Sequence, residues 1–272
     1  MALAGVLGSP WIDLEGVLDL SPIAEIHDEI CLALSSIAVD YTGGSHRSMG
    51  IVPPSHAAES WVDYGEAIER MTDADFSTFV GLADRAEDRA AKRDATFGEE
   101  RSVPLSRRQM LWLKYRFGVY FPWKVYVEMI PNQRWEDKSD AAGKSFTRIA
   151  RALFPKTLAF VETLPFTHVG RCNLMGLEAN DFGTVHRDGV PGDKPDADHF
   201  ITLCPAKNKT LYLWDEASKT KTPVSAKAYW FNDSDYHGVE PAPFFRYSLR
   251  VDGVFRPEFL AQLRDLPKTK AA

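Results

Sequence analysis

Two histidines and one aspartate in the C-terminal half of the chain are spaced so that they could hold a metal ion. His186 and Asp188 are two residues apart, so on an extended chain both side chains point to the same face. His237 follows in Asp235-Tyr-His-Gly-Val239. Two histidines and one carboxylate form the facial triad that leaves open positions on non-haem Fe(II). A lone histidine is more often a satisfied surface or core residue, so the interpretation depends on the joint pattern.

A second group of side chains downstream could bind a carboxylate. Arg246 lies nine residues beyond His237 and shares a strand face with Ser248. A guanidinium fork and a hydroxyl suit a carboxylate that is held by two hydrogen bonds. Arg250 lies on the same face and is a second candidate, but the distance from His237 favours Arg246. The alternative is that Arg246 is an ordinary strand arginine on the solvent face.

These side chains are expected to lie on strands, because the sequence pattern changes from helical to strand-like near residue 166. Beyond that point, short apolar or alternating runs are separated by turn-rich pieces. Several short strands at this spacing suggest a sandwich or barrel of the jelly-roll type. The runs are Val169–Glu178, Phe200–Cys204, Thr210–Trp214, Lys227–Phe231 and Arg246–Phe255, and a short helix is expected over Pro257–Leu266.

The first 165 residues have mainly helical patterns. Ser106-Arg-Arg-Gln109 predicts a capping box that opens a helix through about Phe117. Ala141–Leu153 predicts another helix, which Pro155 breaks or kinks. We therefore expect an α+β protein with a mainly helical region over 1–165, which packs on a β core over 166–272 in one integrated domain.

The order His-x-Asp, distal His and Arg-x-Ser resembles the Fe(II)/2-oxoglutarate-dependent oxygenases over about residues 168–255. This resemblance implies a double-stranded β-helix core of the jelly-roll or cupin type, with Fe(II) as cofactor and 2-oxoglutarate and O2 as cosubstrates. It implies that the iron is held by His186, Asp188 and His237. The related halogenases have a small residue in place of Asp188, so the resemblance implies an oxygenase rather than a halogenase.

The resemblance also implies a site for the cosubstrate and a subgroup of the family. The distal carboxylate of 2-oxoglutarate would pair with Arg246 and accept a hydrogen bond from Ser248, with Arg250 as the second candidate. The stretch from Arg171 to Asp188 is similar to the lead-in strand and turn of oxygenases that hydroxylate Asp, Asn and Pro residues.

Three functions within this family, and one outside it, follow from these patterns. The first is hydroxylation of a C–H bond in an amino-acid or peptidyl side chain, with release of succinate and CO2. The second is a small-molecule oxygenase that tailors natural products, and the third is nucleic-acid demethylation. The alternative of another class is a cupin-type metal- or ligand-binding protein without turnover, which would have no need of a carboxylate anchor near the metal.

Composition sets the broader bounds. Of 272 residues, 44% are hydrophobic and 26% charged, which is ordinary for a globular protein and excludes global disorder, collagen and coiled coil. No apolar run approaches about 18 residues, so a membrane span is not expected. The net charge of -6 argues against bulk binding of nucleic acid. The oligomeric state is left open.

Charge and cysteine placement bear on the compartment. No Lys or Arg precedes Arg47, whereas a secretory signal needs a positive start. The three cysteines are widely and irregularly spaced, which is not a disulfide framework. A reducing, cytoplasmic compartment is the simplest interpretation. Residues 101–156 hold twelve Lys and Arg against four Asp and Glu, interleaved with aromatics, and a helix that packs on the core is favoured there over a ligand site.

Overall fold

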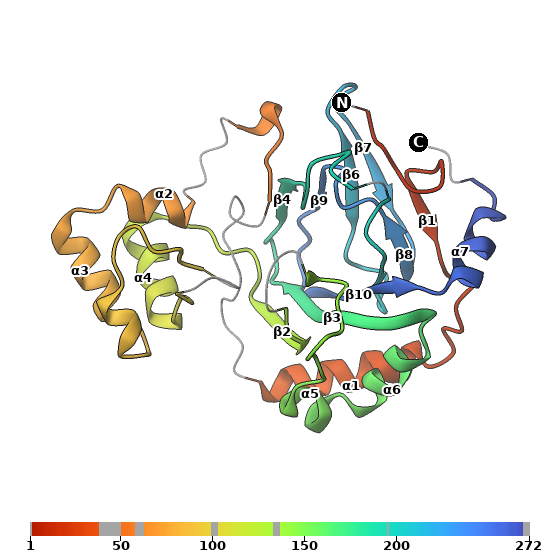
Figure 1. Cartoon of the computed structure of the whole chain (residues 1–272), viewed down its shortest axis with the longest axis horizontal. Coiled ribbons are helices and arrows are strands. Elements are labelled where there is room, and N and C mark those ends of the chain that lie inside the picture. The colour runs from red at the N-terminus through yellow and green to blue at the C-terminus, as the bar shows by residue number, and fades with distance from the viewer. Residues whose placement is uncertain are drawn as a thin grey trace.

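The computed structural model describes residues 2–37, 50–57, 63–98, 103–132, 137–194 and 196–268. Figure 1 shows its parts: the strands of two sheets, a group of helices below them and a lobe of helices to one side. The mixture of helices and antiparallel sheet confirms the expected α+β class. In the described part of the chain, no helix is long and apolar enough to cross a membrane.

The larger sheet has six strands, and its centre is the long antiparallel pair of β10 and β3. The pairing runs from Arg246 opposite Leu177 to Phe255 opposite Phe166, and most of both strands is buried. In spatial order the strands are β1 (Trp11–Asp13), β8 (Ala228–Phe231), β5 (Phe200–Leu203), β10 (Arg246–Phe255), β3 (Phe166–Leu177) and β2 (Val125–Ile130).

The smaller sheet has four strands, and its side chains share one hydrophobic core with the larger sheet. Leu211 and Leu213 of the smaller sheet are buried in the same cluster as Leu203 and Leu249 of the larger one. The spatial order is β4 (Gly183–His186), β9 (His237–Val239), β6 (Leu211–Asp215) and β7 (Thr220–Val224).

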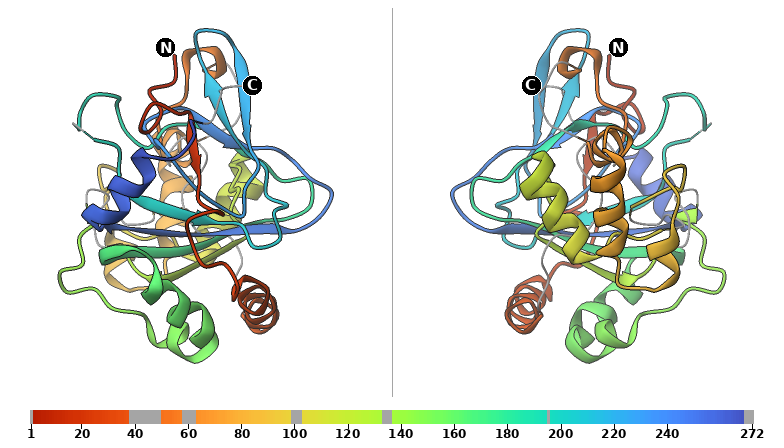
Figure 2. Two further views of the ribbon diagram at one scale, coloured as in Figure 1. Left: turned by 90° about the vertical axis from the view of Figure 1, so that its right-hand side faces the viewer. Right: turned by 90° about the vertical axis from the view of Figure 1, so that its left-hand side faces the viewer.

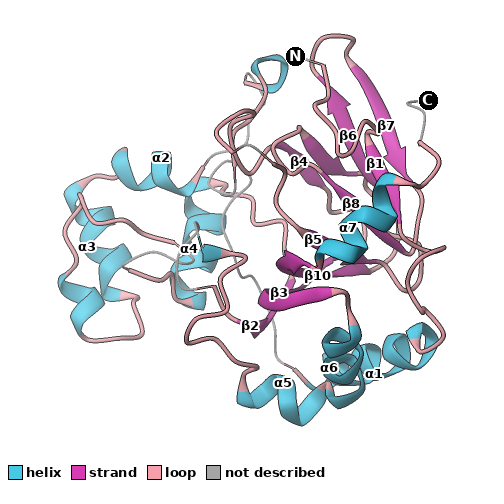
Figure 3. Cartoon of the chain, turned by 45° about the vertical axis from the view of Figure 1, so that its right-hand side comes forward, coloured by secondary structure: helices cyan, strands magenta, loops and turns pink. Residues whose placement is uncertain are grey.

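Helices cover the larger sheet on its outer side. α1 (Ile23–Ser36) buries Ile23, Ile26, Ile30 and Ala33, which recur every three or four residues and so form one stripe. It lies beside α5 (Arg148–Leu153) and α6 (Pro155–Thr163) under β3, and α7 (Pro257–Arg264) follows β10 (Figure 3). Pro155 occupies the first turn of α6, so this proline separates two helices, as the sequence predicts. The first of them begins at Arg148 and not at Ala141, because the side chain of Thr147 caps it there.

The remaining helices form a lobe with a hydrophobic core of its own, seen nearest the viewer on the right of Figure 2. The predicted capping box is confirmed, since Ser106 and Gln109 bond reciprocally at the start of α4 (Arg107–Phe117). Gly118 ends that helix at φ +71°, a conformation that costs glycine no strain. The other members are α2 (Tyr64–Glu69), α3 (Asp73–Gly81) and the 3₁₀ turn Glu87–Ala90.

Candidate metal centre

Strand register brings the two histidines of the sequence pattern together. His186 ends β4 and His237 begins β9, and the two residues are direct partners in the antiparallel pair. Their ring centroids are 4.5 Å apart. Facing residues on paired strands are close neighbours whatever their separation in sequence.

Hydrogen bonds to the main chain orient both imidazoles. Nδ1 of His186 lies 2.8 Å from the carbonyl oxygen of Thr184, and Nδ1 of His237 lies 2.9 Å from that of Asp235. A carbonyl oxygen only accepts, so Nδ1 carries the proton in each ring. The lone pair is therefore on Nε2, the nitrogen through which such histidines bind metal.

Asp188 completes the group. Its Oδ1 lies 3.6 Å from Nε2 of His186 and 4.0 Å from Nε2 of His237. Each of the three residues offers one ligand atom, and these three atoms all lie within 4.8 Å of one another. Two neutral nitrogen donors and one carboxylate are the donor set of a non-haem Fe(II) site, so the residues present fit such an ion.

The surroundings keep the imidazole of His237 neutral. Burial, together with the nearby imidazole of His186, lowers the pKa of His237 to about 4. At neutral pH the ring is therefore uncharged, and the lone pair on Nε2 is available without loss of a proton.

A half-enclosed cavity of about 100 Å³ adjoins the three residues. The smaller sheet supplies Leu211 and Val239 to its wall, and the larger sheet supplies Tyr229 and Phe231. These apolar side chains limit access of water to the groups that line the cavity. Three more side chains line the cavity: Trp123 from the segment before β2, Tyr126 from β2 and Met175 from β3.

Lys209 is a buried cation in this cavity, and the sequence analysis missed it. Its ammonium donates to Oγ of Ser248 at 2.7 Å and to the carbonyl of Met175 at 3.3 Å, and it lies 4.7 Å from the ring centroid of Trp123. Burial lowers the pKa of Lys209 from its usual value to about 7. Lys209 falls in a turn-rich piece just before β6, and no local pattern in the sequence marks such a residue.

Arg246, the favoured anchor, lies outside the cavity lining. Its guanidinium donates to the carbonyls of Glu178 at 2.9 Å and Glu240 at 2.8 Å, and also to those of Asp181 and Phe244. Arg246 is the first residue of β10, so its side chain meets the loops at the end of the sheets. This geometry does not favour the predicted pairing of Arg246 with a ligand carboxylate.

Ser248 and Arg250 do line the cavity, as alternation along β10 predicts. Arg250 already has carboxylate partners, however. Its guanidinium lies 2.7 Å from Asp233, 2.8 Å from Asp252 and 3.4 Å from Asp188. A guanidinium that is committed to three carboxylates has little capacity left for a ligand.

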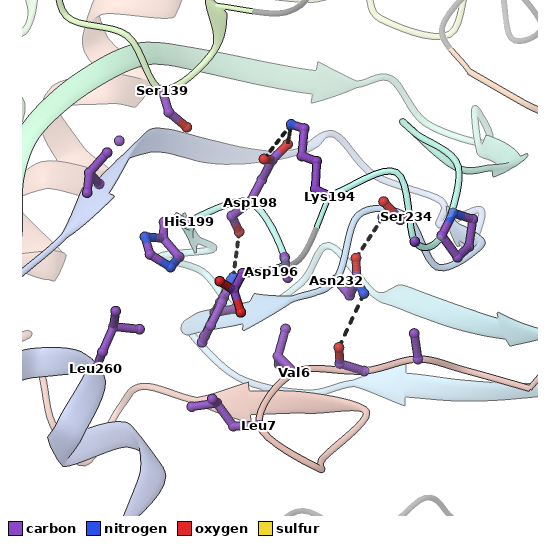
Figure 4. A pocket seen from close by; sticks show the side chains of 18 of the residues that line it. Val6, Leu7, Ser139, Lys194, Asp196, Asp198, His199, Asn232, Ser234 and Leu260 are labelled. Carbon is purple, nitrogen blue, oxygen red and sulfur yellow. Dashed lines mark hydrogen bonds and ion pairs between the residues drawn. The ribbon is translucent and has the colours of Figure 1, made fainter. Parts of the chain in front are cut away.

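A second and larger hollow lies on the other face of β8 (Figure 4). Trp230 and Asn232 contribute to this groove of about 610 Å³, whereas Tyr229 and Phe231 face the metal centre. The groove contains none of the three candidate ligands.

Comparisons with known proteins give structural likenesses alone. No family model and no curated protein matches the chain. A prolyl-4-hydroxylase of Pseudomonas putida is 18% identical over 48% of this chain and 71% of that one, with a TM-score of 0.27. A 2OG-Fe(II) oxygenase family oxidoreductase of Burkholderia pseudomallei is 11% identical over 48% and 70%, with a TM-score of 0.31.

A third solved structure of this kind is the viral collagen prolyl hydroxylase of Paramecium bursaria Chlorella virus-1, in complex with 2OG. It is 9% identical over 52% of this chain and 84% of that one, with a TM-score of 0.27. At such low TM-scores the likenesses carry no argument, so the assignment of function depends on the geometry of the site.

Proposed function

We propose that this chain is an Fe(II)- and 2-oxoglutarate-dependent dioxygenase. The observation that carries the proposal is the convergence of Nε2 of His186, Nε2 of His237 and Oδ1 of Asp188, with both Nδ1 atoms bonded to carbonyls. Iron bound there would supply the oxidative chemistry by which O2, 2-oxoglutarate and a substrate C–H bond give succinate, CO2 and a C–OH group.

The strand order supports a double-stranded β-helix as the fold that builds the site. From β3 onward, β3, β5, β8 and β10 belong to the larger sheet, and β4, β6, β7 and β9 to the smaller one. The chain thus crosses repeatedly between two facing antiparallel sheets, which is the arrangement of an eight-stranded jelly roll. β4 and β9 are neighbours in that arrangement, and they carry the two histidines.

Lys209 and Ser248 are the residues we assign to the distal carboxylate of 2-oxoglutarate, in place of Arg246 and Arg250. Among the described residues, no carboxylate lies within ion-pair distance of Lys209, so its charge is available for a ligand. Ser248 already accepts a hydrogen bond from Lys209, so its own hydroxyl proton can be donated to a carboxylate oxygen.

The cavity volume indicates how the substrate that is to be hydroxylated reaches the metal. About 100 Å³ is far below the 300–1,000 Å³ of typical ligand pockets and suits a small dicarboxylate. The second substrate would then reach the metal from the rim with only a projecting group, such as an amino-acid or peptidyl side chain. A small natural product with a protruding C–H bond is the second candidate.

Succinate release tests the proposal. Protein supplied with Fe(II), ascorbate and 2-oxoglutarate is expected to release succinate slowly even without its second substrate, and His186→Ala is expected to lose this release together with binding of Mn(II). His168→Ala is the matched control, because His168 is exposed and bonds to the carbonyl of Ser139 instead. Equal affinity of wild type and His186→Ala for Mn(II) would refute the ligand assignment.

A further inference from the structure

A network of buried charges lies behind the candidate metal centre. Its cations and anions alternate, so each charge has at least one partner of opposite sign within 3.5 Å. All but Asp188 are at most 6% exposed. The members are Lys138, Arg171, Arg250, Asp188, Asp233 and Asp252.

The two carboxylate oxygens of Asp188 face different partners. Oδ1 faces the histidines, as described above. Oδ2 lies 3.5 Å from Nζ of Lys138 and 3.4 Å from Nη1 of Arg250. The main-chain N–H of Asp188 also donates to the carbonyl of Asp233 at 2.8 Å. The carboxylate is therefore restrained on one side and open on the other.

Asp233 holds the two cations in place. It lies 3.0 Å from Nζ of Lys138 and 2.7 Å from Nη2 of Arg250. Burial alone would raise the pKa of Asp233, but Lys138 and Arg250 lower it well below its usual value. Because Asp233 is ionised, Lys138 is bound between two carboxylates, and moving its ammonium out to solvent would cost each of them an ion pair in the protein interior.

We infer that Lys138 is a positioning residue which, with Arg250, holds Oδ2 of Asp188 so that only Oδ1 is presented to the metal. The inference depends on the proposed function, since it concerns a ligand of the same metal. A carboxylate held in this way binds through one oxygen and leaves more coordination positions open for ligands.

The direction in which metal affinity changes when Lys138 is removed distinguishes a positioning role from a purely electrostatic one. An ammonium so close to a metal ligand repels a divalent cation, so removing its charge would tighten metal binding if charge were all that mattered. If Lys138 orients the carboxylate, its removal weakens metal binding, typically by 10–100-fold for such outer partners.

The experiment measures binding of Mn(II) alone to wild type and Lys138→Met, without 2-oxoglutarate. We expect the variant to bind at least about tenfold more weakly and Lys138→Arg to recover most of the loss. Equal or tighter binding by Lys138→Met would overturn the inference. No binding by wild type would instead refute the proposed function, so the two failures are distinguishable.

A double variant keeps the test decisive if Lys138→Met does not fold. Lys138→Met/Asp233→Asn removes both charges of one ion pair, so neither member remains buried without the other. The net charge near the metal also stays the same. Weaker Mn(II) binding by the double variant supports positioning, and unchanged binding refutes it. The visible absorption of the Co(II)-loaded proteins should also differ, because a rotated carboxylate changes the ligand field.

Lys194 provides a matched control. It pairs with Asp198 at 2.6 Å on the rim of the groove in Figure 4, and Asp198 in turn lies 3.6 Å from Nζ of Lys138. Lys194→Met removes a cation from the edge of the same network without touching Asp188. Its Mn(II) affinity is expected to stay within about twofold of wild type, and a tenfold loss would show that contact with Asp188 is not the cause.

Discussion

A lysine is rarely buried without a carboxylate, and this makes Lys209 the most informative single residue of the cavity. Its ammonium contacts one hydroxyl, one carbonyl and the face of one aromatic ring. Burial disfavours the charged form, and none of these neutral partners restores it fully, which explains the pKa of about 7. A dianionic ligand would supply the missing negative charge.

The affinity for 2-oxoglutarate should therefore fall as the pH rises. Above about pH 7 the free protein holds Lys209 neutral, and binding a carboxylate must take up a proton. We expect the Kd of the Mn(II)-loaded protein to rise by up to about tenfold per pH unit between pH 7 and 9. Isothermal titration of 2-oxoglutarate at several pH values measures this.

Lys209→Arg is the control for that pH dependence. Arginine stays charged throughout this range, so the variant should bind with a Kd that changes little between pH 7 and 9. An equally steep rise in Lys209→Arg, or a flat profile in wild type, would contradict the assignment of Lys209 to the carboxylate.

At the scale of elements, a short segment packs against the end of the strand that bears the first histidine. Ile51 and Arg187 exchange main-chain hydrogen bonds at 2.9 and 3.0 Å. Ser55 donates from its N–H and hydroxyl to Glu216, just beyond β6. Residues 50–57 therefore connect β4 to β6 across the smaller sheet and fix the backbone beside His186.

Gly50 shows how close this contact is. A Cβ there would lie 2.4 Å from the carbonyl oxygen of Arg187 and 2.9 Å from Cδ2 of His186. We expect Gly50→Ala to displace the imidazole and weaken Mn(II) binding by about tenfold. Gly16→Ala is the control, because a Cβ at Gly16 meets nothing within 4 Å. Unchanged Mn(II) affinity in Gly50→Ala would show that the segment yields instead of the ring.

At the scale of the whole molecule, the lobe of α2, α3 and α4 has a core separate from that of the sheets. Phe79 is fully buried at its centre, with Phe97 and Trp112 at ring-centroid distances of 5.2 and 6.4 Å. At the edge of the lobe, between Val119 and Phe121 of its core, Tyr120 donates a hydrogen bond at 2.9 Å to Asp181 in the loop between β3 and β4. The lobe thus has its own packing, with a polar link toward the sheets.

Phe79→Ala should accordingly destabilise the lobe and spare the site. Truncation of a fully buried phenylalanine costs about 3–5 kcal/mol, which denaturant unfolding would report. The affinity for Mn(II) under native conditions should match wild type, because the ligands belong to the other core. A parallel loss of Mn(II) affinity in a folded variant would show that the lobe supports the site.

Elements whose patterns are local could be predicted from the sequence alone. Alternation placed β10 at Arg246–Phe255, and side-chain chemistry placed the start of α4 at Ser106. The predicted boundary near residue 166 says less about where strands occur, since β1 and β2 precede it and join the larger sheet. Strands this short lack a pattern of their own, and pairing with distant strands stabilises them. The division into 1–165 and 166–272 stays a prediction.

Which charged side chains face the cavity could not be predicted from the sequence and follows from the fold. Ser248 and Arg250 share a strand face with Arg246, yet Arg246 bonds to loop carbonyls and Arg250 to carboxylates. Lys209 reaches the cavity from the loop just before β6. Spacing fixes the face of a strand that a residue occupies. Which buried charge stays available to a ligand depends on partners that are far away in the sequence, and the fold alone brings these together.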